Sequence, residues 1–155
     1  MLKALVPVDG SPNSLDAVAH VIKLVRDREP LELHLLNVQP GLTGDITTFV
    51  PRRVVTDFHR EEGEKALAGA RELLDRAAIA YTPHIAVGHP PAAIAHCARK
   101  LGCDKVIMGT HGYGTVRQLI LGSVSHEAIH LLDPSIPVTL VKAGYGAAID
   151  GASHG

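Results

Sequence analysis

Short, mainly apolar runs alternate along the chain with segments in which apolar residues recur at helical spacing. The runs occupy residues 2–8, 31–38, 81–87, 104–108 and 136–141. Their length and their content of Val, Ile and Leu predict buried strands. The first run ends at Asp9 and Gly10, after which Ser11 and Pro12 have the pattern of a helix N-cap and first turn.

The other connections predict three further helices, at residues 51–78, 90–101 and 123–132. The longest has an apolar stripe that includes Phe58, Leu73 and Leu74, and its other face is charged. Residues 39–50 form a long connection, for which a surface loop and a flap over a ligand are both open interpretations. Residues 1–142 are expected to form one domain, and the Gly- and Ala-rich residues 143–155 a flexible tail.

Strict alternation of strands and helices predicts an α/β fold with three layers, in which helices cover both faces of a five-stranded parallel sheet. A doubly wound sheet of this size fits the strand order 3-2-1-4-5. In that order the first and fourth strands are neighbours, and ligands bind where the winding reverses between them. Asp9 and Gly109, which end these two strands, are therefore predicted to lie close together.

Composition limits the partners of the chain. The net charge is −1, aromatic residues make up 3%, and Lys and Arg form no dense cluster, so nucleic acid is not expected as a partner. No apolar run approaches the length of a membrane span, so no membrane partner is expected. Cys97 and Cys103 are interpreted as small buried hydrophobic residues, which predicts a cytoplasmic protein.

A glycine-rich segment leads from the fourth run into the last helix. Gly109 and Gly112 allow close approach of a ligand to the backbone, and Gly122 and Ser123 open a helix whose dipole favours an anion. The segment contains no lysine and has neither the P-loop spacing nor the third glycine of the dinucleotide motif. It therefore predicts an anion site built from backbone N–H groups, with hydroxyl groups such as that of Ser125 as additional donors.

The spacing G-x-x-G, nine residues, G-[ST] is the motif of a known family. Over residues 2–142 the chain resembles the universal stress protein family, whose nucleotide-binding members carry this motif. The opening Val6-Pro7-Val8-Asp9-Gly10-Ser11 is similar to the first-strand signature of the family, and Ile136-Pro137-Val138 to its last strand.

The resemblance implies an adenine nucleotide alpha hydrolase-like fold, binding of ATP or AMP, and a homodimer. It places the adenine against Pro7, Val8, Val38 and Met108. It places the phosphates against Gly109, Gly112, Gly122, Ser123, Val124 and Ser125. His111 either contacts a phosphate or is simply exposed, and Asp9 either binds the ribose or Mg²⁺ or is a turn carboxylate.

The dimer implied by the resemblance uses residues 136–141. In the predicted order this run is an apolar edge strand interrupted only by Pro137, and an unprotected edge invites pairing.

The function expected from this resemblance is nucleotide-dependent stress response or signalling by binding. A slow ATPase or self-phosphorylating protein is the first alternative. The second is a zinc hydrolase, because His126-Glu127-x-x-His130 matches a helical zinc motif. On a helix both histidines would point away from the apolar face formed by Val124, Ala128, Ile129, Leu131 and Leu132, so this alternative is disfavoured.

Overall fold

The computed structural model describes residues 1–41, 57–110 and 121–153. In chain order the elements are β1 (Leu2–Pro7), α1 (Pro12–Arg26), β2 (Leu31–Gln39), α2 (Asp57–Arg76), β3 (Tyr81–Val87), α3 (Pro90–Lys100), β4 (Lys105–Gly109), α4 (Ser123–Leu131), β5 (Val138–Val141) and α5 (Tyr145–Ser153). The strands form one parallel sheet in the order β3-β2-β1-β4-β5. The predicted fold class and strand order are confirmed.

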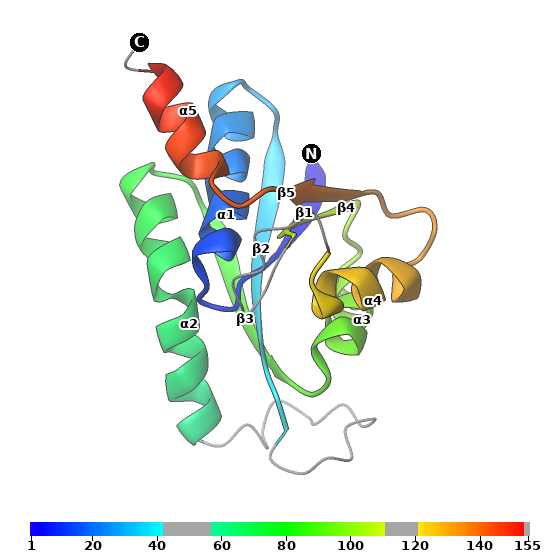
Figure 1. Ribbon diagram of the computed structural model, residues 1–155. Helices are drawn as coiled ribbons and strands as arrows, with labels where there is room; N and C mark the ends of the chain where they lie inside the picture. The colour runs from blue at the N-terminus through cyan, green and yellow to red at the C-terminus, as the bar shows by residue number, and fades with distance from the viewer. Residues whose placement is uncertain (42–56, 111–120, 154–155) are drawn as a thin grey trace.

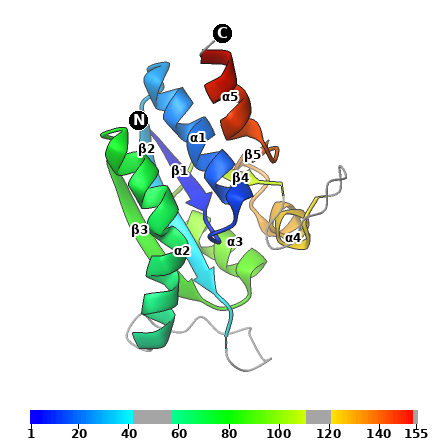
Figure 2. The same ribbon diagram turned by 60° about the vertical axis from the view of Figure 1, so that its left-hand side comes forward.

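Helices cover both faces of the sheet, with α1 and α2 on one side and α3 and α4 on the other (Figures 1 and 2). Successive residues of a strand point to opposite faces. Val6 accordingly packs with Val18 and Leu67 on the α1 and α2 face, and Leu5 packs with Ile94 on the α3 and α4 face. Both faces of β1 are therefore buried, which explains its continuous apolar run. Within the described residues, no helix is long and apolar enough to cross a membrane.

The long helix α2 buries most of its predicted apolar face, including Leu74, but its first turn packs differently. Phe58 is 57% exposed, whereas His59 and Gly63 are buried. A side chain at Gly63 would lie 2.7 Å from the Ile85 side chain, so the small glycine lets α2 approach β3 here. The predicted apolar stripe is therefore wrong at Phe58 but right at Leu73 and Leu74, which pack in the core. Residues 51–56 and most of the 39–50 connection lie outside the described residues.

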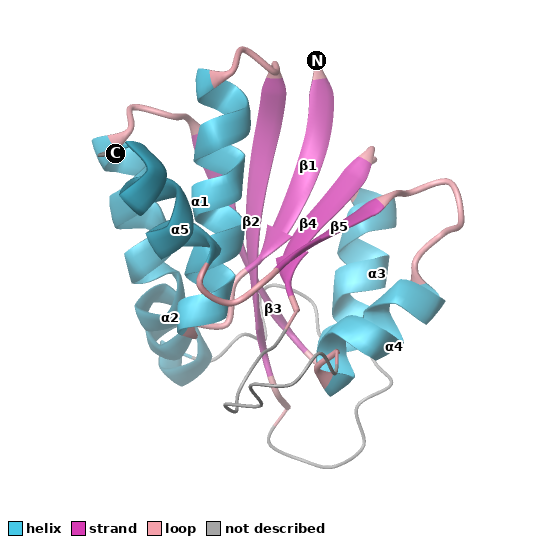
Figure 3. Cartoon of the chain, turned by 45° about the horizontal axis from the view of Figure 1, so that its top comes forward, coloured by secondary structure: helices cyan, strands magenta, loops and turns pink. Residues whose placement is uncertain are grey.

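The C-terminal segment forms a helix, so the predicted flexible tail is wrong for Tyr145–Ser153. Figure 3 shows α5 beside α1. The Asp16 carboxylate accepts hydrogen bonds from the N–H groups of Gly144 (3.0 Å) and Gly146 (2.9 Å). A further hydrogen bond of 2.9 Å joins Nδ1 of His20 to the Tyr145 hydroxyl. These contacts fix the C-terminal segment against α1, although its Gly and Ala content predicted a flexible tail.

Candidate functional site

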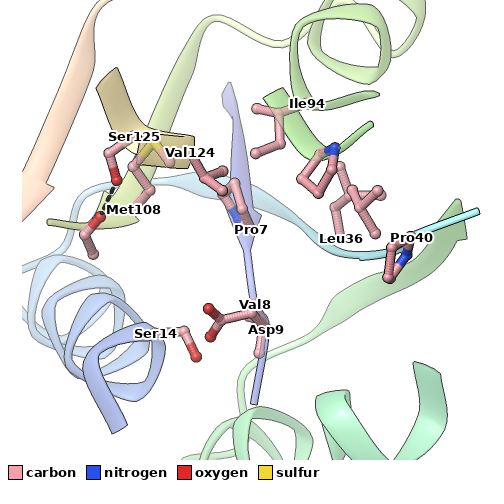
Figure 4. Close-up of a pocket in the computed structure, with 13 residues that line it drawn as sticks. Pro7, Val8, Asp9, Ser14, Leu36, Pro40, Ile94, Met108, Val124 and Ser125 are labelled. Atoms are coloured by element: carbon pink, nitrogen blue, oxygen red, sulfur yellow. Dashed lines mark hydrogen bonds between the residues drawn. The ribbon is translucent and has the colours of Figure 1, made fainter. Parts of the chain in front are cut away.

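A pocket of about 280 Å³ lies at the carboxyl ends of β1 and β4, where the strand order reverses (Figure 4). This volume is close to the lower end of the range for small-molecule sites. The pocket is lined by Pro7, Val8, Asp9, Ser14, Leu36, Val38, Pro40, Pro90, Ile94, Met108, Gly109, Val124 and Ser125. The prediction that Asp9 and Gly109 meet at one site is confirmed.

On one side of the pocket, the start of α1 is closed by its own residues. Gly10 has a φ of +85°, a conformation that glycine adopts without strain, and it turns the chain after β1. The N–H of Ser11 donates to Oδ1 of Asp9 at 2.9 Å. The Ser11 hydroxyl caps the helix by accepting from the N–H of Ser14, and Pro12 has no N–H to satisfy. Asp9 is thus a turn carboxylate that also lines the pocket.

On the other side, the start of α4 has no side-chain cap. Its N-cap residue is Gly122, whose own N–H donates to the Thr110 carbonyl at 2.7 Å. The N–H groups of Ser123, Val124 and Ser125 make no hydrogen bond to any residue in the described ranges. Free N–H groups and the positive end of the helix dipole make this terminus suited to an anion.

The Ser125 side chain links α4 to β4. Its hydroxyl donates to the Gly109 carbonyl at 2.9 Å (dashed in Figure 4), and the residue is 2% exposed. The hydroxyl proton is therefore already used, which differs from the prediction that it donates to an anion. Ser125 instead fixes the first turn of α4 against the end of β4.

Asn13, a buried side chain that sequence reasoning missed, holds the same region from α1. Its amide nitrogen donates to the Val141 carbonyl at 3.1 Å, and its Oδ1 accepts from the Thr110 hydroxyl at 3.4 Å. A Cβ atom at Gly109 would lie 2.6 Å from that Oδ1. Glycine at 109 is thus required for the close approach of β4 to α1. The only signal in the sequence was a polar residue on the inner face of a helix's first turn.

The rest of the pocket is an apolar wall. Pro7, Val38 and Met108 were predicted to form it, and the structure adds Leu36, Pro40, Pro90 and Ile94. These added side chains are ordinary apolar residues, so no pattern in the sequence marks them as pocket residues.

Behind this wall, polar side chains fix the ends of β1 and β2. The Asn37 amide donates to the Val8 carbonyl at 2.8 Å, and Gln39 donates to Asn37 at 2.7 Å.

The remaining predicted residues fall into two groups. Gly122 and Ser123 lie at the start of α4, beside the pocket but not among its lining residues. His111 and Gly112 lie outside the described residues.

Comparison with known proteins gives the family. The model of the universal stress protein family matches residues 1–142. The chain belongs to this family. It is 28% identical over 144 residues to universal stress protein MJ0531 of Methanocaldococcus jannaschii, covering 90% of this chain and 81% of that protein.

Two similar solved structures contain nucleotides. One is a universal stress protein from Archaeoglobus fulgidus in complex with dAMP (TM-score 0.66, 19% identity, covering 92% of this chain and 98% of that one). The other is a universal stress protein family protein from Arabidopsis thaliana with AMP bound (TM-score 0.65, 16% identity, 92% of each chain). At these identities the likeness shows a shared fold.

In this universal stress protein the His-Glu-x-x-His segment faces outward. His126 and His130 are exposed, as predicted, and Glu127 bonds to His89 of α3 at 3.2 Å. The helix packs through Ala128 and Leu132, whereas Leu131 is 50% exposed, so its assignment to the apolar face was wrong. Among the described residues, no group of three or more His, Cys, Asp or Glu is placed to hold a metal ion.

Both cysteines are free and lie in the apolar layer under α3. Burial raises the pKa of the Cys97 thiol, and it raises the pKa of Cys103 to about 11. Neither thiol is therefore activated as a nucleophile at neutral pH. The interpretation as a small buried hydrophobic residue is confirmed for Cys103, whereas Cys97 is only partly buried.

Proposed function

We propose that this universal stress protein binds ATP or AMP in the pocket and acts as a nucleotide-dependent module in stress response or signalling. The observation that carries the proposal is the uncapped start of α4 beside an apolar pocket. An adenine nucleotide combines an apolar ring with an anionic phosphate, and the two sides of the pocket match these two parts. The dAMP and AMP complexes of the two similar proteins support the same ligand class.

In this proposal the adenine lies against Pro7, Val8, Val38 and Met108. The phosphates lie at Gly109 and at the start of α4, where the N–H groups of Ser123, Val124 and Ser125 are available. Gly112 and Gly122 allow the backbone to approach the phosphates, and His111 is a further candidate contact.

Asp9 is the candidate for contact with the ribose hydroxyls or with Mg²⁺. One of its oxygen atoms accepts from the N–H of Ser11, and the residue lines the pocket. Mg²⁺ is commonly held by one or two carboxylates together with nucleotide phosphates, so a single Asp fits this mode of binding. Bound Mg²⁺ would neutralise phosphate charge.

The test is calorimetric titration of the protein with AMP and with ATP plus Mg²⁺. The variant Gly122→Asp places a carboxylate at the open helix start, where it caps the free N–H groups and repels phosphate. We expect its nucleotide affinity to fall at least about tenfold, equivalent to about 1.4 kcal/mol. Gly122→Asn gives an uncharged side chain of the same shape, and Gly151→Asp adds the same charge on α5, far from the pocket in sequence.

Different results would contradict different parts of the proposal. Wild-type protein that binds neither nucleotide at millimolar concentration would refute the function. Gly122→Asp protein that binds as tightly as Gly151→Asp protein would refute the placement of the phosphates. ATP that stays intact over hours of incubation is expected for a binding module, and steady hydrolysis would favour the slow ATPase instead.

We also propose a cytoplasmic homodimer that forms through β5. This strand lies at the edge of the sheet, and Val138 and Leu140 are only half-buried in the single chain. Pairing of two β5 edges would satisfy their open backbone groups. Sedimentation is expected to give a dimer at micromolar concentration, and a monomer there would refute this association.

A further inference from the structure

Two exposed histidines on α4 form a pair that nothing else in the described structure engages. His126 and His130 are four residues apart on the helix, and their ring centroids are 4.8 Å apart with planes inclined at 79°. Neither ring makes a hydrogen bond or ion pair with another described residue. Their ring nitrogens are therefore available to an external ligand.

The intervening glutamate does not belong to this pair. Glu127 is turned to His89, the N-cap residue of α3, with an Oε2–Nε2 distance of 3.2 Å. This contact removes the glutamate from the position in which a zinc hydrolase would need its base, and it fixes α4 to α3. The histidine pair thus lies on a helix that is fixed to its neighbour.

A second histidine pair in the molecule differs, because its ring nitrogens are hydrogen-bonded within the protein. His34 Nδ1 and His84 Nε2 are 2.9 Å apart, and Nε2 of His34 lies 2.8 Å from Glu32. The centroids of these two rings are 5.1 Å apart, and the ring planes are inclined at 26°. Nδ1 of His34 and Nε2 of His84 are joined by a hydrogen bond, so they bind each other and not an external ligand.

We propose that His126 and His130 form a surface site for a divalent late first-row transition metal ion. Side chains at i and i+4 on a helix have Cβ atoms about 5–6 Å apart. A tetrahedral ion with metal–nitrogen distances of about 2.0–2.1 Å places its two nitrogen ligands about 3.3 Å apart. Exposed histidines at this spacing reach that separation by side-chain rotation alone.

Two protein ligands leave the other coordination positions to water. The site is accordingly a clip across one turn of α4, with an affinity order Cu²⁺ above Ni²⁺ above Zn²⁺. An ion that binds the folded helix and not the unfolded chain stabilises the protein by RT ln(1 + c/Kd), which increases with the concentration c of free ion. The proposal is independent of nucleotide binding.

The experiment is a titration of the whole protein with Ni²⁺ and Zn²⁺ at about pH 8, where imidazole is neutral. Wild-type protein is compared with the double variant His130→Leu/Leu131→His. This exchange keeps the composition and the number of exposed histidines but changes their spacing from four residues to five, which moves one ring off the shared face. Both positions are exposed, so the fold should survive, and the melting temperature without metal checks this.

We expect wild-type protein to bind one equivalent of Ni²⁺ and to melt at a higher temperature with the metal. The exchanged variant and His126→Ala should bind at least about tenfold more weakly and show no metal-dependent rise. Stoichiometric binding of equal strength in the exchanged variant would overturn the proposal. Wild-type protein without stoichiometric binding at 100-fold excess of metal, or a rise that persists in His126→Ala, would also overturn it.

Discussion

Two helices start at the same edge of the sheet, beside the same pocket, and their first turns are built in opposite ways. α1 follows β1 and is capped by Ser11, with Pro12 in the first turn and the N–H of Ser11 bound to Asp9. α4 is preceded by Gly122, which has no side chain to cap it. Each helix dipole favours an anion at its start, but only α4 leaves its N–H groups open to one.

The two helix starts at this edge of the sheet therefore have different roles in the pocket. The closed start of α1 needs no ligand and holds a carboxylate in place at the pocket. The open start of α4 offers backbone N–H groups to a ligand that brings negative charge. Four tests follow: one at Gly109, where β4 contacts the first turn of α1, one at each helix start, and one at His20 in the middle of α1.

Gly109→Val should have the largest effect, because Gly109 lies against Asn13 of α1 and accepts the hydrogen bond from Ser125 of α4. The added side chain would begin 2.6 Å from Asn13 Oδ1 and 2.8 Å from the Asn13 carbonyl. We expect the free energy of unfolding to fall by about 1–3 kcal/mol, as for other overpacked sites. Urea unfolding measures it, and Gly151→Ala, which meets no atom within 4 Å, is the control. Equal stability of the two variants would show that the contact is not tight.

Ser125→Ala should destabilise the open start by removing the hydroxyl that binds the Gly109 carbonyl. A buried carbonyl left without its partner costs about 1–3 kcal/mol. The matched control is Ser123→Ala, two residues earlier and exposed, for which a change within about 0.5 kcal/mol is expected. Thermal and urea unfolding compare the two. Equal losses would mean that the 2.9 Å hydrogen bond does not fix α4 to β4.

Ser11→Ala should affect stability but not nucleotide affinity, since the closed start is not the proposed anion site. Loss of an N-cap serine costs about 1 kcal/mol of stability, and Ser11→Gly should cost only a few tenths. AMP titration of the alanine variant should match the wild type. A large loss of AMP affinity in the Ser11→Ala variant would indicate that the phosphate binds at the start of α1 and not at the start of α4.

The smallest expected effect is a pH dependence at His20 in the middle of α1, where the ring contacts Tyr145 of α5. Burial, with smaller contributions from Lys105 and Lys23, lowers the pKa of His20 from its ordinary value of 6.5. Below that value the unfolded chain binds the proton more readily than the folded one, so stability falls as pH falls. His20→Gln should lose this part of the slope between about pH 7 and pH 5. Unfolding curves across this range that are parallel for both proteins would contradict it.

The sequence was sufficient for the fold class because the five strands are short apolar runs and helices α1 to α4 have apolar residues at helical spacing. The strand order and the meeting of Asp9 with Gly109 followed from topology alone. The side chains that line the pocket from α3, such as Pro90 and Ile94, could not be found this way, because their role depends on where a helix lands on the sheet. Phe58 was misplaced for a similar reason: the buried face of α2 is set by Gly63 against Ile85, a contact between distant residues.

Asn13 and α5 teach the same lesson for polar groups. Hydrogen bonds from the Asn13 amide to Val141 and from the Gly144 N–H to Asp16 join residues 128 positions apart. A pattern of neighbouring residues in the sequence cannot predict a hydrogen-bond partner at such a distance. Composition therefore misjudged the C-terminal residues, whose helix depends on contacts with α1.

The packing of α5 on α1 also bears on how the protein is made. The first helix to leave the ribosome carries the Asp16 carboxylate and the His20 ring that the last helix needs. β1, which is synthesised first, lies in the middle of the sheet and receives β4 only after more than a hundred residues have been added. Contacts so distant in sequence form slowly. This domain can therefore be completed only after residues 145–153 have been synthesised, and a chain that stalls at Lys142 would lack the contacts between α5 and α1.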